Sequence, residues 1–296
     1  MSKENLTIPF ESPLVPVALG LENTIQFRCY KGISCFNACC KNADITLTPY
    51  DIVRLKNRLG MTSTEFLVKH TVLFEMDGSG MLGVKLKTQD NELVCLLVSE
   101  EGCTVYEDRP SACRYYPVGL MAMRPMGSPS DEAHYFLVKE EHCKGHEEDR
   151  TLTLAEYRTE QGVEEYDATN REWYQIILKK RSSGPTVGKP SQTSFQMFFM
   201  CSYDIDRFRN FVMSDNFKAV YDLDEKQYEE FNKDEISLLK FSFRLMKQVL
   251  FGENTIPVNQ DAADKRFEER KDILAKRRDM EIEKALAEDN RYEPSE

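Results

Sequence analysis

The sequence lacks any run of about 18 apolar residues, the length that a membrane-spanning helix needs. Residues 1–6 also lack the apolar core of a secretory signal, so we expect a cytoplasmic protein. Positive charge is scarce, because 39 Lys and Arg stand against 50 Asp and Glu and leave a formal net charge of -11. Nucleic acids and anionic membranes bind basic surfaces, so we expect neither as a partner.

The signatures of several enzyme classes are missing as well. No glycine-rich loop follows a predicted strand, so the sequence shows no phosphate cradle for a nucleotide cofactor. No Ser-His-Asp arrangement and no pair of catalytic carboxylates stands out. These absences leave enzyme activity undecided, and no catalytic residue is assigned.

Cysteine, in contrast, is abundant and clustered. The chain has nine cysteines, and four of them lie in a twelve-residue segment that begins at Cys29. In a reducing cytosol, such clustering indicates metal binding or catalysis more than disulfides, and an odd total does not suit a fully paired framework. We predict eight metal ligands: Cys29, Cys35, Cys39, Cys40, Cys95, Cys103, Cys113 and Cys143.

Thiolates are soft ligands that suit zinc and the iron of iron-sulfur clusters. A tetrahedral zinc site needs four of them, so eight cysteines suffice for two zinc ions or for two four-cysteine clusters. Adjacent side chains diverge, and Cys39 and Cys40 are therefore expected to serve two neighbouring centres, one each. A single iron-sulfur cluster with structural spare sulfurs is the other solution. We favour iron-sulfur, of the 4Fe-4S type, over zinc.

Four motifs between Phe27 and His146 stand out, which are the knuckle Cys29–Cys40, the helix start at 48–55, Cys95-Leu96-Leu97 and the segment 102–117. In these motifs the segment resembles the YkgJ-type cysteine-cluster proteins, a bacterial family described as zinc- or iron-chelating. The resemblance implies a metal-binding domain, which also occurs in the flagellin lysine-N-methylase. The usual family knuckle is Cys-x2-Cys-x2-Cys-Cys, whereas here the first gap is five residues and the second is three.

Other residues near the cysteines have more than one interpretation. Arg109, Arg114, Tyr106 and Tyr116 either line a site beside the metal or shape the turn that presents Cys113. His146 follows Cys143 at ligand-like spacing, but eight cysteines are available without it. Cys201 lies among aromatic residues and is expected in a hydrophobic core.

The predicted fold class is α+β. A metal-stapled N-terminal domain with short helices and a small antiparallel sheet (residues 1–150) precedes a helical region (151–260) and a charged, solvated helix or tail (261–296). Capping signals predict helices after Thr48 and Thr62, and alternating apolar residues predict strands at 82–86, 93–98 and 133–138. Helices are also expected from 151 to about 180 and at 233–250.

Two hypotheses of function follow. In the first, iron or zinc has a chemical role, such as electron transfer or assistance to a group transfer. In the second, zinc only staples the N-terminal domain, and the helical half binds a partner protein.

Overall fold

The computed structural model describes residues 13, 15, 17–41, 43–76, 81–89, 92–123, 132–182 and 191–289. The chain forms two compact units, Met1–Gln175 and Ile176–Glu296. The first unit combines small sheets with short helices, and the second is mostly helical, which confirms the predicted α+β class. The three-part division at residues 150 and 260 stays a prediction. Among the described residues, no helix is both long and apolar enough to cross a bilayer.

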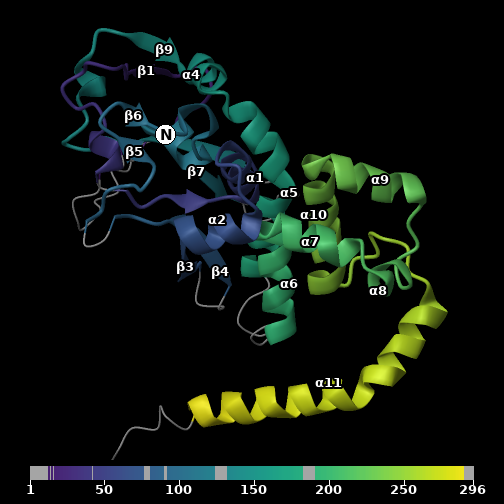
Figure 1. Ribbon diagram of the computed structural model, residues 1–296. Coiled ribbons are helices and arrows are strands. Elements are labelled where there is room, and N and C mark those ends of the chain that lie inside the picture. Colours follow the sequence, from purple (N-terminus) through teal and green to yellow (C-terminus); the bar gives the residue numbers. More distant parts are fainter. Residues whose placement is uncertain are drawn as a thin grey trace, which may run out of the picture. The chain divides into compact units, whose positions relative to one another are not determined.

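The strands of the first unit are short. They are β1 (Thr24–Gln26), β2 (Thr46–Leu47), β3 (Thr71–Glu75), β4 (Leu82–Leu86), β5 (Val98–Ser99), β6 (Gly102–Cys103), β7 (Val118–Met123), β8 (Glu132–Leu137) and β9 (Thr151–Thr153). Within the described residues they form four antiparallel sheets, β1-β9, β2-β4-β3, β5-β6 and β7-β8. The β1-β9 pair places Ile25 opposite Leu152 and so joins the two ends of the cysteine-bearing segment (Figure 1).

The helices of this unit begin at the capping signals seen in the sequence. They are α1 (Pro49–Arg58), α2 (Ser63–His70), α3 (Ser111–Tyr115), α4 (Leu154–Gln161) and the start of α5 (Val163–Ser182), with 3-10 helices η1 (Ala38–Cys40), η2 (Tyr106–Asp108) and η3 (Lys144–Glu147). Reciprocal capping boxes, Thr48 with Asp51 and Thr62 with Glu65, begin α1 and α2. Each box satisfies two backbone N–H groups that the first turn leaves without partners, which is why these helices start where they do.

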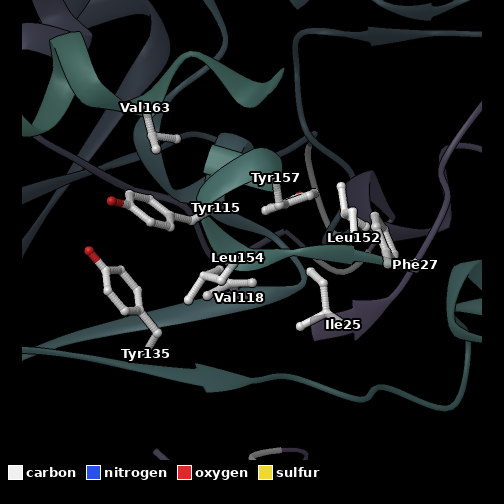
Figure 2. Close-up of a cluster of buried hydrophobic side chains, with 9 residues drawn as sticks. All are labelled: Ile25, Phe27, Tyr115, Val118, Tyr135, Leu152, Leu154, Tyr157 and Val163. Atoms are coloured by element: carbon white, nitrogen blue, oxygen red, sulfur yellow. The ribbon is translucent and has the colours of Figure 1, made fainter. Parts of the chain in front are cut away.

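One hydrophobic cluster lies between β1, β9, α3, α4 and the strands β7 and β8. Figure 2 shows its nine side chains, which are Ile25, Phe27, Tyr115, Val118, Tyr135, Leu152, Leu154, Tyr157 and Val163. The rings of Tyr115 and Tyr135 are stacked at 6.3 Å, and both hydroxyls accept hydrogen bonds from the Arg158 guanidinium, at 2.6 and 2.7 Å. Cys143 packs against the edge of this cluster, so the core reaches the cysteines.

The start of α1 is held by α5. The Asn170 side chain accepts a hydrogen bond from Tyr50 N at 3.2 Å and donates one to Thr48 Oγ1 at 3.0 Å. The Tyr50 ring meets the Tyr166 ring edge to face, with centroids 4.9 Å apart. These buried contacts fix the α1 N-terminus, whose Asp51 later bears on the cysteines.

The second unit contains the end of α5 and the helices α6 (Gln192–Tyr203), α7 (Ile205–Val212), α8 (Asp215–Lys218), α9 (Glu225–Lys233), α10 (Glu235–Phe251) and α11 (Gln260–Asp289). Its core is aromatic, because Phe208, Phe217 and Phe231 all pack on Phe241 of α10. Cys201 is buried in α6 with its sulfur 3.6 Å from Met197 Sδ, as a core residue should be.

Two predicted elements differ from the structure. The apolar run Leu93–Val98 is not a strand: only Val98 belongs to one, and β4 pairs with β2 and β3 instead. Leu93 and Leu96 are exposed, and the predicted hairpin is reduced to an isolated antiparallel bridge between Thr88 and Cys95, while Cys95 N donates to Cys40 O. The predicted helix from 151 is preceded by β9 and interrupted at Gly162, which adopts a positive φ of 61° that glycine tolerates best.

Candidate metal centre

The cysteine knuckle follows β1 and ends in the 3-10 helix η1. Asn37 precedes this helix with a φ of 66°, a left-handed conformation that asparagine adopts more readily than most residues. Its Nδ2 donates to Ser99 O at 3.2 Å, which ties the knuckle to β5. The tight turn therefore presents Cys39 and Cys40 beside the hairpin that carries Cys103.

A backbone junction brings Cys143 to the start of the knuckle. Arg28 N donates to Gly145 O at 3.0 Å, and Lys144 N donates to the Cys35 sulfur at 3.2 Å. Burial raises the pKa of Cys29 to about 11, helped by the negative charges of Cys39, Cys35 and Cys143 and opposed by Arg109. Cys143 therefore lies near Cys29 and Cys35, although more than a hundred residues separate it from them in the sequence.

A second junction joins the end of the knuckle to Cys95 and Cys103. Cys95 N donates to Cys40 O at 2.8 Å. Just beyond Cys95, β5 pairs with β6, and Val98 lies opposite Cys103. The short β5-β6 hairpin thus returns the chain toward the knuckle and places Cys40, Cys95 and Cys103 in one neighbourhood.

Helix α3 adds Cys113 to this second group. Burial raises the pKa of Cys113, and the charges of Cys95, Cys103 and Cys39 raise it further. The helix N-terminus is fixed by Asp51, whose Oδ1 accepts from both Ser111 N and Ser111 Oγ at 2.8 Å. The end of α1 that Asp51 caps therefore also positions the cysteine of α3.

Cys39 and Cys40 stand where the two groups meet. Their sulfurs are 4.0 Å apart. A hydrogen bond from the Cys40 thiol lowers the pKa of Cys39 to about 7, and the same interaction raises the pKa of Cys40. Of the two thiols, Cys39 is therefore the one that ionises more readily, and its charge raises the pKa of cysteines in both groups.

The ligand types suit a soft metal. All nine cysteines lie in the described part of the chain, and all are free thiols. Among the described residues, no three or more His, Cys, Asp or Glu side chains are already arranged as a metal site. The eight cysteines therefore suit zinc or iron by donor type, and their assignment as ligands stays a prediction; closure of the sulfurs on a metal would accompany its binding.

Polar side chains flank the sulfurs. Burial raises the pKa of Cys29 and of Cys103, and the positive charge of Arg109 opposes the rise at both cysteines, so it acts on both groups. The same guanidinium donates to Tyr106 O at 2.8 Å and to Gln161 Oε1 at 2.6 Å, so it also shapes the turn before Cys113. The two interpretations of Arg109 are therefore compatible.

The remaining residues divide between the site and the core. Burial raises the pKa of Tyr116, as do its interactions with Cys143 and Glu140, which places its hydroxyl close to both. Arg114 is buried and donates to Gln161 O at 2.6 Å, which is a structural contact. His146 Nε2 pairs with Val138 O at 3.0 Å, so this nitrogen is engaged by the backbone.

Sequence reasoning missed two neighbours of the cysteines. Asp51 lies in the first turn of α1, and nothing local signals its bond to Ser111 or its effect on Cys113. The negative charge of Glu140 opposes the lowering of the pKa of Cys39, which places Glu140 near the knuckle. Nothing in its sequence context singles Glu140 out among many acidic residues. Both depend on contacts between distant segments.

Comparison with known proteins gives one match. Residues 28–144 match the family model CxxCxxCC, described as "Putative zinc- or iron-chelating domain". The matched segment includes all eight predicted ligands, covers less than half of the 296-residue chain and confirms the resemblance seen in the sequence. No curated protein and no solved structure matches the chain significantly.

Proposed function

Residues 28–144 carry the zinc- or iron-chelating cysteine domain of this family, and we propose that they bind their metal through eight cysteines. The ligands are Cys29, Cys35, Cys39, Cys40, Cys95, Cys103, Cys113 and Cys143. An iron-sulfur cluster of the 4Fe-4S type is the favoured metal group, with a role in electron transfer or in assisting a group transfer. The protein is expected to act in the cytoplasm.

The observation that carries this proposal is the gathering of distant thiols around Cys39. Its negative charge raises the pKa of cysteines from separate segments, which are Cys29, Cys40, Cys95, Cys103, Cys113 and Cys143. Charges of one sign that lie this close repel one another when ionised. A bound cation removes that repulsion, since metal binding replaces the thiol protons.

Contacts from the backbone support ligation by sulfur. Lys144 N donates to the Cys35 sulfur at 3.2 Å, and Leu97 N donates to the Cys95 sulfur at 3.4 Å. Such N–H donors stabilise a thiolate and tune the reduction potential of an iron-sulfur cluster. When bound, the cluster would supply one-electron chemistry, and the chain would supply the sulfurs, these donors and the nearby charge of Arg109.

The test is metal analysis of protein purified without oxygen. We expect brown protein that contains iron and acid-labile sulfide and loses visible absorbance on reduction. Colourless protein with zinc and no iron would overturn the redox version and retain the metal site. Protein that holds neither metal, even after anaerobic reconstitution with iron and sulfide or with zinc, would overturn the proposal.

One observation favours the second function, a zinc-stapled module that binds a partner protein. Helix α11 exposes large apolar side chains, with Phe267 at 55% and Met280 at 69% exposure. Apolar side chains on a solvated helix are common at protein interfaces. Zinc content, together with lost partner capture by a Phe267→Ser/Met280→Ser variant that keeps its zinc, would support this function.

A further inference from the structure

We infer that the eight cysteines form two separate metal centres: Cys29, Cys35, Cys39 and Cys143 hold one, and Cys40, Cys95, Cys103 and Cys113 hold the other. We call them the Cys143 centre and the Cys113 centre. This inference rests on the proposed metal-binding function and adds the number of centres and the ligands of each.

The backbone already separates the cysteines into two groups. The Cys143 centre is assembled where β1 meets η3, through the bond from Arg28 N to Gly145 O at 3.0 Å and the bond from Lys144 N to Cys35 Sγ at 3.2 Å. These two bonds hold three of its four ligands together. On the knuckle side, both bonds lie at its beginning, at Arg28 and Cys35, before the adjacent pair Cys39–Cys40.

The Cys113 centre is assembled by different elements. The bond from Cys95 N to Cys40 O at 2.8 Å and the β5-β6 hairpin bring three of its ligands together. The fourth, Cys113, lies on α3, which Asp51 anchors to α1, and the charges of Cys95 and Cys103 act on it. Apart from the knuckle, which carries ligands of both, the two centres thus draw on different elements.

Electrostatic influence divides in the same way. The largest charge effects on Cys29 come from Cys39, Cys35 and Cys143, in that order. Those on Cys113 come first from Cys95 and Cys103, and Cys39 follows them. Apart from Cys39, which acts on both, the cysteines that act on Cys29 and those that act on Cys113 are therefore different, and each set consists of ligands of one centre.

The adjacent pair Cys39–Cys40 divides between the centres. Among the cysteines, Cys39 acts most on Cys29, whereas Cys103 acts more than Cys39 does on Cys95 and on Cys113; Cys39 also acts on Cys103. Beyond Cys39 itself, the charges that act most on Cys40 are those of Cys113 and Cys95. Cys39 therefore belongs with Cys29, and Cys40 belongs with Cys95.

The ligand count agrees with this division. Each centre receives four thiolates, the number that a tetrahedral zinc ion or one 4Fe-4S cluster takes from a protein. The two centres are neighbours, since the sulfurs of Cys39 and Cys40 are 4.0 Å apart. Arg109 acts on a ligand of each centre and offsets part of their shared negative charge.

Pairs of cysteine variants test the division. Cys143→Ser and Cys113→Ser are each expected to lower the metal content, measured by elemental analysis of anaerobic protein, to about half of the wild-type value. The same-centre pair Cys29→Ser/Cys143→Ser should keep that half, whereas the cross-centre pair Cys143→Ser/Cys113→Ser should lose nearly all metal. The control Cys201→Ser, in the second unit, should retain the full content.

Single variants that each abolish all metal in folded protein would overturn the division, and so would a same-centre pair that loses more than either single variant. Circular dichroism shows whether each variant is folded. If the variants do not fold, titration of cobalt(II) into the metal-free wild type decides, since two equivalents support two centres and one equivalent overturns them. A wild type that binds no iron, zinc or cobalt would instead refute the proposed function itself.

Discussion

Asp51 and Ser111 are joined by two hydrogen bonds across sixty residues of sequence. The Asp51 Oδ1 atom accepts from the backbone N and from the Oγ of Ser111, both at 2.8 Å, while Oδ2 accepts from Thr48 N at 2.8 Å. The carboxylate is fully buried, and burial raises its pKa while these hydrogen bonds oppose the rise. One side chain thus caps α1 and fixes the helix that carries Cys113.

Replacing Asp51 by Asn should weaken both connections. An amide has only one acceptor oxygen, so one N–H donor, that of Thr48 or of Ser111, would face the Asn NH2 group. We expect a loss of about 1–3 kcal/mol in the free energy of unfolding of the metal-free protein, measured by urea denaturation. We also expect weaker metal binding at the Cys113 centre. Ser111→Ala, which keeps the backbone bond, should cost less; equal losses for the two variants would contradict this role of Asp51.

Gly145 determines how closely η3 approaches β1. A Cβ atom at this position would lie 2.9 Å from Arg28 O and 2.5 Å from the Phe27 ring. Gly145→Ala should therefore push the segment of Cys143 away from Cys29, at a cost of about 1–3 kcal/mol in unfolding free energy. The measurement is thermal unfolding together with metal content, which should fall at the Cys143 centre.

A matched control is Gly119→Ala. An added Cβ there meets Val138 at 3.6 Å, which is an ordinary contact. This variant should keep the full metal content. If Gly145→Ala kept it as well, the close approach of η3 to β1 would not be what positions Cys143.

Much of the fold could be predicted from local signals. The starts of α1 and α2 follow from capping boxes whose members are three residues apart, and the knuckle follows from cysteine spacing. Such signals need no information from the rest of the chain. The α+β class and the metal-binding domain were predicted for the same reason.

The errors arose where distant contacts override local pattern. The run Leu93–Val98 has the composition of a strand, yet its pairing with the preceding segment is an isolated bridge between Cys95 and Thr88. Cys95 N instead donates to Cys40 O, more than fifty residues earlier, and Leu93 faces solvent. The pairing of β1 with β9 likewise spans the whole cysteine domain and has no signal in either segment. The division of ligands between two centres depends on such long-range contacts, so spacing alone could not give it.

His146 should make the first unit less stable in acid. Burial lowers the pKa of its imidazole, and so does nearby Lys139, while the hydrogen bond to Val138 O opposes the change. The unfolded chain, with an ordinary value of 6.5, then binds a proton more readily than the folded chain does. Stability that is present above pH 6.5 is therefore lost as the pH falls below it.

The measurement is the unfolding free energy of the metal-free protein between pH 7.5 and pH 5, with and without His146→Gln. Glutamine can still donate to Val138 O but does not titrate in this range. The variant should show a shallower loss of stability in acid. Identical slopes would mean that other groups, such as His70, whose pKa burial also lowers, cause the acid sensitivity.

Removal of the metal should loosen the first unit and leave the second intact. The eight predicted ligands come from the knuckle, the Cys95 segment, β6, α3 and the residue before η3, so a bound metal would link all of these segments. The second unit has an aromatic core around Phe241 and carries only Cys201, a buried core residue. A metal present at 1,000 times its dissociation constant would stabilise the folded first unit by about 4 kcal/mol, and a chelator would remove that stabilisation.

Hydrogen exchange followed by mass spectrometry gives the two units separately. Exchange should accelerate in segments 28–41, 92–116 and 143–147 after chelation and stay unchanged in α6 and α10; equal acceleration in those two helices would show that the metal stabilises the chain as a whole.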